Sequence, residues 1–328
     1  MRELILKTEH WPVKGSFTIS RSSLKEIIVV TARITDNGYR GWGECRPYAR
    51  YNETAESVVK DIENVRRSIE TGVSNDDLLS LLPAGAARNV IDCALWDLKA
   101  KQTRKTVSEL LNLPRPQQRT TAYTLSINSP AQMRIAAQKA MQYPILKIKI
   151  GGPEGLKSCI AILDARPDAQ LIIDANEALK VEDIKSFKKQ LKGLPIIMIE
   201  QPIPAGQDKL IPYSPNELPI LCADESLHTE NDLDRLWSLG YRAINVKLDK
   251  CGGLTAGLSL MKAAKSKGFV IMAGCMVGTS LAMAPMMILE SYADYIDLDG
   301  PLLLAKDRDN KITYESSNII SASPKLWG

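Results

Sequence analysis

The chain has 328 residues, of which 45% are hydrophobic and 24% are charged, and its formal net charge is +4. This length fits one large barrel-type domain or two domains and excludes a single small module, and the composition excludes wholesale disorder. Because basic and acidic residues are mixed along the chain rather than gathered in blocks, no nucleic-acid partner is expected.

The first third of the chain is expected to form an α+β unit. Strands are predicted over 25–34 and 39–45, joined by a hairpin turn at Asp36-Asn37-Gly38, and helices over 57–71 and 86–102. Gly41-Trp42-Gly43 is the nearest match to a dinucleotide-binding glycine turn. It lacks the third glycine and the following helix, so a nucleotide site is not predicted.

From residue 120 onward, short apolar runs alternate with amphipathic stretches long enough for a helix. This rhythm is typical of a parallel sheet covered by helices on both faces. Eight such units favour a closed barrel, whereas a doubly wound open sheet would fit six strands more naturally. The predicted strands are 122–127, 146–150, 171–175, 196–201, 220–225, 243–248, 270–276 and 295–299.

Acidic residues stand at the ends of three successive predicted strands: Asp174, Glu200 and Asp224. Each one alone could be a helix cap or a solvated strand end. In a barrel, however, the three would converge, and unpaired carboxylates at short range repel one another. Oxygen-only ligands with open positions suit Mg²⁺, so one Mg²⁺ per subunit is predicted.

Lysines provide the second part of the predicted site. Lys147 and Lys149 share one face of their strand, and Lys247 ends a strand four positions further around the barrel. Lys149 and Lys247 are therefore expected to face each other across the barrel mouth. Two neighbouring ammonium groups disfavour each other's charge, so a lowered pKa is expected for one of the pair Lys147 and Lys149.

This pattern of Lys-x-Lys, three acidic ligands and a later lysine resembles the muconate-lactonizing subgroup of the enolase superfamily. The resemblance implies a modified (β/α)7β barrel of the TIM type over 116–300, an N-terminal α+β capping domain over 1–115, and a C-terminal segment, 301–328, returning to that domain. Within the subgroup the sequence is similar to dipeptide epimerases, most closely to the L-Ala-D/L-Glu type. The stretches that carry this likeness are 83–89, 92–98, 224–226, 247–254, 274–276 and 297–301.

The resemblance implies epimerisation of a dipeptide such as L-Ala-D-Glu or L-Ala-L-Glu by 1,1-proton transfer through an ene-diolate. Lys149 and Lys247 would be the two bases, and Lys147 would add positive charge at the substrate carboxylate. Asp297 and Asp299 would bind a free α-ammonium group. By resemblance Arg21 would meet the side-chain carboxylate of a C-terminal Glu, and Thr124 would line the site. Ser22 departs from the glycine expected after Arg21.

Other functions compete with this interpretation. Cycloisomerisation, o-succinylbenzoate synthesis and N-acylamino acid racemisation need the same lysines but no ammonium-binding acidic pair. A Schiff-base aldolase could use a buried lysine but leaves the three carboxylates unexplained, and a non-catalytic binding barrel is the remaining alternative.

The expected setting is cytoplasmic, with a role in murein peptide recycling. Six cysteines without a CxxC pair predict reduced thiols, and the N-terminus has no secretory signal pattern. The uncharged run 268–289 contains glycines and a proline, so it is interpreted as a strand, loop and helix rather than a membrane span. Homo-oligomerisation is left open.

Overall fold

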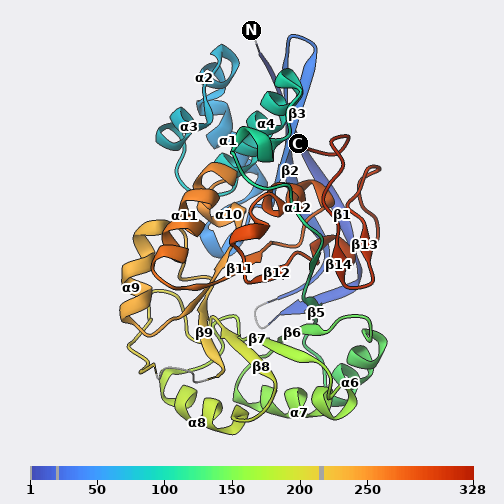
Figure 1. Ribbon diagram of the computed structural model, residues 1–328, viewed down its shortest axis with the longest axis vertical. Helices are drawn as coiled ribbons and strands as arrows, with labels where there is room; N and C mark the ends of the chain where they lie inside the picture. Colours follow the sequence, from blue (N-terminus) through green and yellow to red (C-terminus); the bar gives the residue numbers. More distant parts are fainter. Residues whose placement is uncertain (1, 20–21, 214–217) are drawn as a thin grey trace.

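The computed structural model describes residues 2–19, 22–213 and 218–328. An antiparallel sheet of three strands, in the order β1-β2-β3, lies at the N-terminal end of the molecule (Figure 1). Its strands are β1 (Glu3–Ile19), β2 (Ser22–Asp36) and β3 (Tyr39–Cys45). The two strands and the turn predicted from sequence are confirmed, whereas β1 was not predicted.

Helices pack against one face of this sheet and complete the capping unit. Gly41 and Gly43 allow α4 to approach β3 closely, because a Cβ atom at either position would lie 2.1 Å from Ala94 O or 2.0 Å from Val90 O. The Gly-Trp-Gly stretch therefore serves helix packing. The helix predicted over 57–71 is broken at Val65. The helices are α1 (Ala55–Asn64), α2 (Arg66–Thr71), α3 (Asn75–Leu81), α4 (Ala86–Thr103) and α5 (Val107–Leu110), with the short η1 (Ala49–Tyr51) before α1.

Eight parallel strands form the second sheet, in sequential order from β5 to β12. A backbone bridge between Thr121 and Ile296 brings the first and last strands together, so the sheet closes into the predicted barrel. The strands are β5 (Tyr123–Leu125), β6 (Ile145–Lys149), β7 (Gln170–Asp174), β8 (Ile196–Glu200), β9 (Ile220–Ala223), β10 (Ala243–Val246), β11 (Val270–Gly274) and β12 (Tyr295–Asp297).

Helices surround the barrel and bury the outward-facing side chains of the strands. Leu146 and Ile148 belong to this large outer core. Ile172 and Met272 belong to a separate small cluster of inward-facing residues. The helices are α6 (Pro130–Lys139), η2 (Pro153–Gly155), α7 (Leu156–Ala165), α8 (Val181–Leu191), η3 (Glu230–Asp232), α9 (Leu233–Ser238), α10 (Leu248–Cys251), α11 (Leu254–Ser266), α12 (Ser280–Met287) and η4 (Glu290–Tyr292).

The connection from β8 to β9 departs from the βα rhythm. Its described residues, 201–213 and 218–219, form no helix. Five prolines occur between residues 202 and 219, and proline removes the backbone N–H groups that a helix needs.

The C-terminal segment runs from the barrel to the capping unit. It contains η5 (Gly300–Leu303), β13 (Tyr314–Glu315) and β14 (Asn318–Ile319), which pairs with β4 (Arg119–Thr120). Arg308 binds Glu9 of β1 and Glu44 of β3, both at 2.6 Å. The indole of Trp327 donates a hydrogen bond to the carbonyl oxygen of Cys93 in α4 at 3.1 Å. In the part of the chain described here, no helix has the length and apolar character needed to cross a membrane.

Candidate active site

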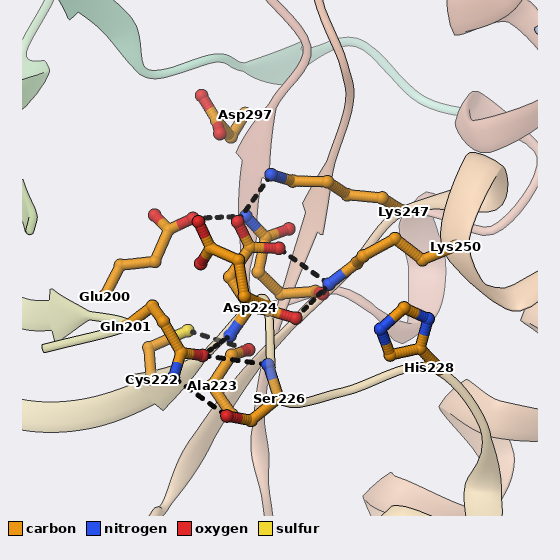
Figure 2. A network of polar contacts seen from close by, with 12 residues as sticks. Glu200, Gln201, Cys222, Ala223, Asp224, Ser226, His228, Lys247, Lys250 and Asp297 are labelled. Atoms are coloured by element: carbon orange, nitrogen blue, oxygen red, sulfur yellow. Dashed lines mark hydrogen bonds and ion pairs between the residues drawn. The ribbon is translucent and has the colours of Figure 1, made fainter. Parts of the chain in front are cut away.

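The candidate site lies where the capping unit covers the C-terminal ends of the barrel strands. A small cavity of about 60 Å³ is lined there by residues of both units. The capping unit contributes Phe17, Leu24, Arg46, Tyr48 and Tyr51, and the barrel contributes charged residues that include the three predicted lysines. Charged side chains from several strands meet at this point (Figure 2).

The three predicted acidic residues come together on neighbouring strands. Asp174 and Glu200 end β7 and β8 and are paired in register, and Asp224 follows β9. Asp174 and Glu200 are completely buried, and Asp224 is 2% exposed. A group of buried carboxylates this close needs cationic partners.

Ammonium groups supply those partners. Lys147 Nζ lies 2.7 Å from Glu200 Oε2 and 3.4 Å from Asp174 Oδ2. Lys149 Nζ lies 2.5 Å from Asp174 Oδ2, and Lys247 Nζ lies 2.6 Å from Asp224 Oδ2. The register of β6 with β7 places Lys149 beside Asp174. Since Lys149 ends β6 and Lys247 follows β10, the two lysines approach the mouth from opposite sides of the eight-stranded barrel.

Two further buried residues hold the carboxylates in place, and neither was predicted from the sequence. Lys250 Nζ binds Asp224 Oδ1 at 2.6 Å and also contacts the backbone oxygen of Asp224. Asn245 donates from Nδ2 to Glu200 Oε1 at 2.8 Å. Lys250 lies one helical turn after Lys247 in α10, and this spacing was the available signal in the sequence.

The charges of the site shift the pKa values in opposite directions. Burial raises the pKa of Glu200 to about 8, and the nearby carboxylate of Asp174 adds to this effect. Burial also opposes ionisation of Asp224, but Lys247 and Lys250 hold its pKa well below the usual range. For Lys147, burial disfavours the charged form, yet Asp297, Glu200 and Asp174 together place its pKa well above the ordinary lysine value.

The lowered pKa expected for one lysine of the pair is therefore not that of Lys147. The expectation rested on repulsion between the two ammonium groups. The buried carboxylates around Lys147 outweigh that repulsion, because opposite charges at short range favour the charged form.

The donor chemistry of the three acidic residues fits a hard dication. Each offers only oxygen atoms, and the three stand on consecutive strands of one barrel. In the present arrangement no three acidic, histidine or cysteine side chains among the described residues are placed to hold a metal ion. Asp174 and Asp224 each contact a lysine ammonium group.

A second acidic pair lies at the end of β12. Asp297 Oδ2 is 2.7 Å from Lys147 Nζ, whereas Asp297 Oδ1 is buried with no hydrogen-bond donor among the described residues. Asp299 Oδ2 accepts a hydrogen bond from the backbone N–H of Thr124 at 2.6 Å. Burial raises the pKa of Asp299 to about 7, and the charge of Asp297 adds to this shift. Thr124 also lines the cavity.

The structure thus brings together nine of the ten residues named from the sequence. The tenth, Arg21, lies outside the described residues. One cationic residue of the cavity wall, Arg46, was not predicted at all. It follows β3 in the capping unit, about 100 residues before the first catalytic candidate, so no local pattern connects it with the barrel.

The chain is similar to known proteins over nearly its whole length. Residues 1–112 match the N-terminal domain of mandelate racemase/muconate lactonizing enzymes, and residues 131–307 match an enolase C-terminal domain-like model. An N-acetyl-D-glutamate racemase from Pseudoalteromonas sp. is 44% identical over 92% of this chain and 95% of that protein. The L-Ala-D/L-Glu epimerase of Escherichia coli K12 is 39% identical over 97% of this chain and 99% of that protein.

Solved structures show the same likeness. An enolase family member from Agrobacterium tumefaciens, with homology to dipeptide epimerases and with bound sodium and L-Ala-L-Glu, gives a TM-score of 0.95 at 43% identity and full coverage (100%) of both chains. A dipeptide epimerase from Methylococcus capsulatus, complexed with Mg and L-Arg-D-Lys, gives a TM-score of 0.90 at 26% identity over 99% of this chain and 98% of that one.

Proposed function

The chain belongs to the mandelate racemase/muconate lactonizing enzyme family of the enolase superfamily, and from this membership we propose that it epimerises dipeptides of the L-Ala-D/L-Glu type. The observation that carries the proposal is the opposed placement of Lys149 and Lys247 at the two sides of one buried, carboxylate-lined mouth. A single Cα atom held between them can lose a proton to one lysine and receive a proton from the other. That exchange inverts the configuration.

The α-proton of a carboxylate is hard to remove, because negative charge accumulates on an oxygen that is already negative. Mg²⁺ bound by Asp174, Glu200 and Asp224 would supply positive charge at that oxygen. Lys149 and Lys247 line the cavity beside Asp174 and Asp224 and would act as the two bases on opposite faces of Cα. Lys147, which is buried beside these carboxylates, would add to the positive potential at the substrate carboxylate.

Asp297 and Asp299 support a substrate with a free amino group. Each has one oxygen engaged by the protein and one that can accept a hydrogen bond from an ammonium group. A dipeptide brings its ammonium group to one end of the site and its α-carboxylate to the other. By resemblance, Arg21 is proposed to contact the substrate side chain.

A second candidate is racemisation of an N-acylated amino acid. It is favoured by the 44% identity to an N-acetyl-D-glutamate racemase. That reaction uses the same lysines and carboxylates, but its substrate carries no ammonium group for Asp297 and Asp299 to bind.

A comparison of two substrates distinguishes the two candidate functions. The purified protein with Mg²⁺ is incubated with L-Ala-L-Glu or N-acetyl-L-Glu, and the D-Glu content is followed after hydrolysis. We expect D-Glu to form from the dipeptide at a much higher kcat/KM. Faster conversion of N-acetyl-L-Glu would favour the racemase, and no conversion of either compound would reject both. Murein recycling and a cytoplasmic location stay predictions.

A further inference from the structure

Arg46 differs from the other cations of the cavity in having no acidic partner. Arg46 is 8% exposed and lines the cavity together with Tyr48 and Val277. The guanidinium donates one long hydrogen bond, 3.4 Å from Nη1 to Val277 O, and makes no ion pair with any carboxylate of the described residues. Asp249 accepts the backbone N–H of Arg46 at 3.0 Å and Asn89 Nδ2 at 2.8 Å, but it accepts no hydrogen bond from the Arg46 guanidinium.

A buried, unpaired guanidinium is costly to a protein. Burial lowers the pKa of Arg46, but arginine remains charged at any physiological pH. The remaining N–H groups of its planar fork suit a carboxylate, which can accept two parallel hydrogen bonds. The Tyr48 ring, 5.8 Å from the guanidinium carbon, supports the cation but provides no acceptor of this kind. The missing partner is therefore an anion that enters the cavity.

The position of Arg46 restricts which part of a substrate can be that anion. The α-carboxylate is assigned to the floor of the barrel, among the acidic residues and Lys147, and the ammonium group to Asp297 and Asp299. Arg46 belongs to the capping unit and reaches the cavity beside Val277, above the floor. The remaining arm at the reacting Cα atom is its side chain.

We propose that Arg46 binds a carboxylate on the side chain of the residue that is epimerised, and so selects dipeptides with an acidic second residue. This inference rests on the proposed epimerase function and gives Arg46 a part in the specificity besides the contact proposed for Arg21. The variants of Arg46 test that part with Arg21 unchanged.

The test compares L-Ala-L-Glu with its neutral isostere L-Ala-L-Gln. We expect kcat/KM of the native protein to be at least about 10-fold higher for the Glu dipeptide than for the Gln dipeptide. In Arg46→Gln, kcat/KM for the Glu dipeptide should fall by about 10- to 150-fold, mainly because KM rises. Activity on L-Ala-L-Gln should change less than about threefold. Arg46→Lys, which keeps the charge without the fork, should lose less than Arg46→Gln.

The matched control is Arg66→Gln, which removes an arginine of the same capping unit that pairs with Glu63 and Glu70. This variant should keep the native kcat/KM for both dipeptides. Calorimetric titration of the native protein and Arg46→Gln with both dipeptides repeats the comparison without turnover.

Equal losses of activity on the Glu and Gln dipeptides would overturn the role of Arg46 but not the epimerase function. Unchanged activity on both dipeptides would have the same meaning, and would leave recognition of the side chain to Arg21. If Arg46→Gln does not fold, the proposal can still be tested on the native protein. Equal kcat/KM and equal affinity of the native protein for the two dipeptides would overturn it. Absence of α-proton exchange with every dipeptide would instead reject the proposed function.

Discussion

Asp299→Asn removes one negative charge from the proposed ammonium site with the smallest change in structure. The substitution keeps an oxygen that can accept the Thr124 N–H, which now lies 2.6 Å from Oδ2. Asp297 is a less suitable target, since its loss would also remove a partner of Lys147 at 2.7 Å. Because Asp299 is only 3% exposed, its contact with an ammonium group would be a largely desolvated, charge-assisted hydrogen bond.

Loss of one such contact costs about 1.5–3 kcal/mol, so kcat/KM for L-Ala-L-Glu should fall by about 10- to 150-fold. The rate is measured by the appearance of D-Glu at substrate concentrations well below KM. N-acetyl-L-Ala-L-Glu lacks the ammonium group, so it should be a poor substrate of the native protein. Its kcat/KM should differ little between the native protein and the variant.

The matched control is Asp294→Asn, at the opposite end of the same strand, where the carboxylate accepts the Ile271 N–H. This variant should retain the native kcat/KM. Equal losses on the free and acetylated dipeptides in Asp299→Asn, or no loss on either, would refute the assignment of the acidic pair to an ammonium group.

Metal removal, pH and the C-terminal segment each provide a further prediction. Chelation should abolish α-proton exchange and Mg²⁺ should restore it, and Glu200→Gln should weaken Mg²⁺ binding in calorimetry; full activity of metal-free protein would contradict this. Because burial and Asp297 raise the pKa of Asp299 to about 7, the folded state holds this proton more tightly than the unfolded chain, and the free energy of unfolding should fall as the pH rises from about 4 to about 7. Asp299→Asn should remove this pH-dependent loss of stability, so it should raise the Tm more at pH 8 than at pH 5. Equal changes in Tm at the two pH values would show that the pKa of Asp299 is not raised. Arg308→Met should lower the free energy of unfolding by about 3–5 kcal/mol in denaturant titrations, because it leaves the fully buried Glu44 without its cation; a loss below about 1 kcal/mol would argue against a stabilising pair.

The barrel and most of its charged residues could be predicted because the relevant signals are local. Strands buried on both faces produce short continuous apolar runs, and a charge directly after such a run marks the strand end. The alternation of Leu146, Lys147, Ile148 and Lys149 was sufficient to place both lysines inside the barrel, and the structure buries Leu146 and Ile148 under the helices.

The features that were missed depend on contacts between distant segments. In β1, polar residues and the register shift between Pro12 and Phe17 obscure the alternation of apolar and polar side chains that would identify a strand. The segment is a strand because it pairs with β2. Arg46 reaches the cavity only because the capping unit lies over the barrel. The pKa of Lys147 depends on acidic residues from three other strands, whose combined effect cannot be read from the sequence spacing of two lysines.

The opposed lysines are tested most directly by deuterium incorporation at Cα. Lys149→Ala and Lys247→Ala are incubated separately with L-Ala-L-Glu and with L-Ala-D-Glu in D₂O, and the loss of the α-proton signal is followed by NMR. Neither variant should epimerise either dipeptide. Each should exchange the α-proton of one epimer only, and the two variants should act on opposite epimers, because the remaining lysine reaches only its own face of Cα. Exchange of both epimers at equal rates by either variant would contradict the two-base account.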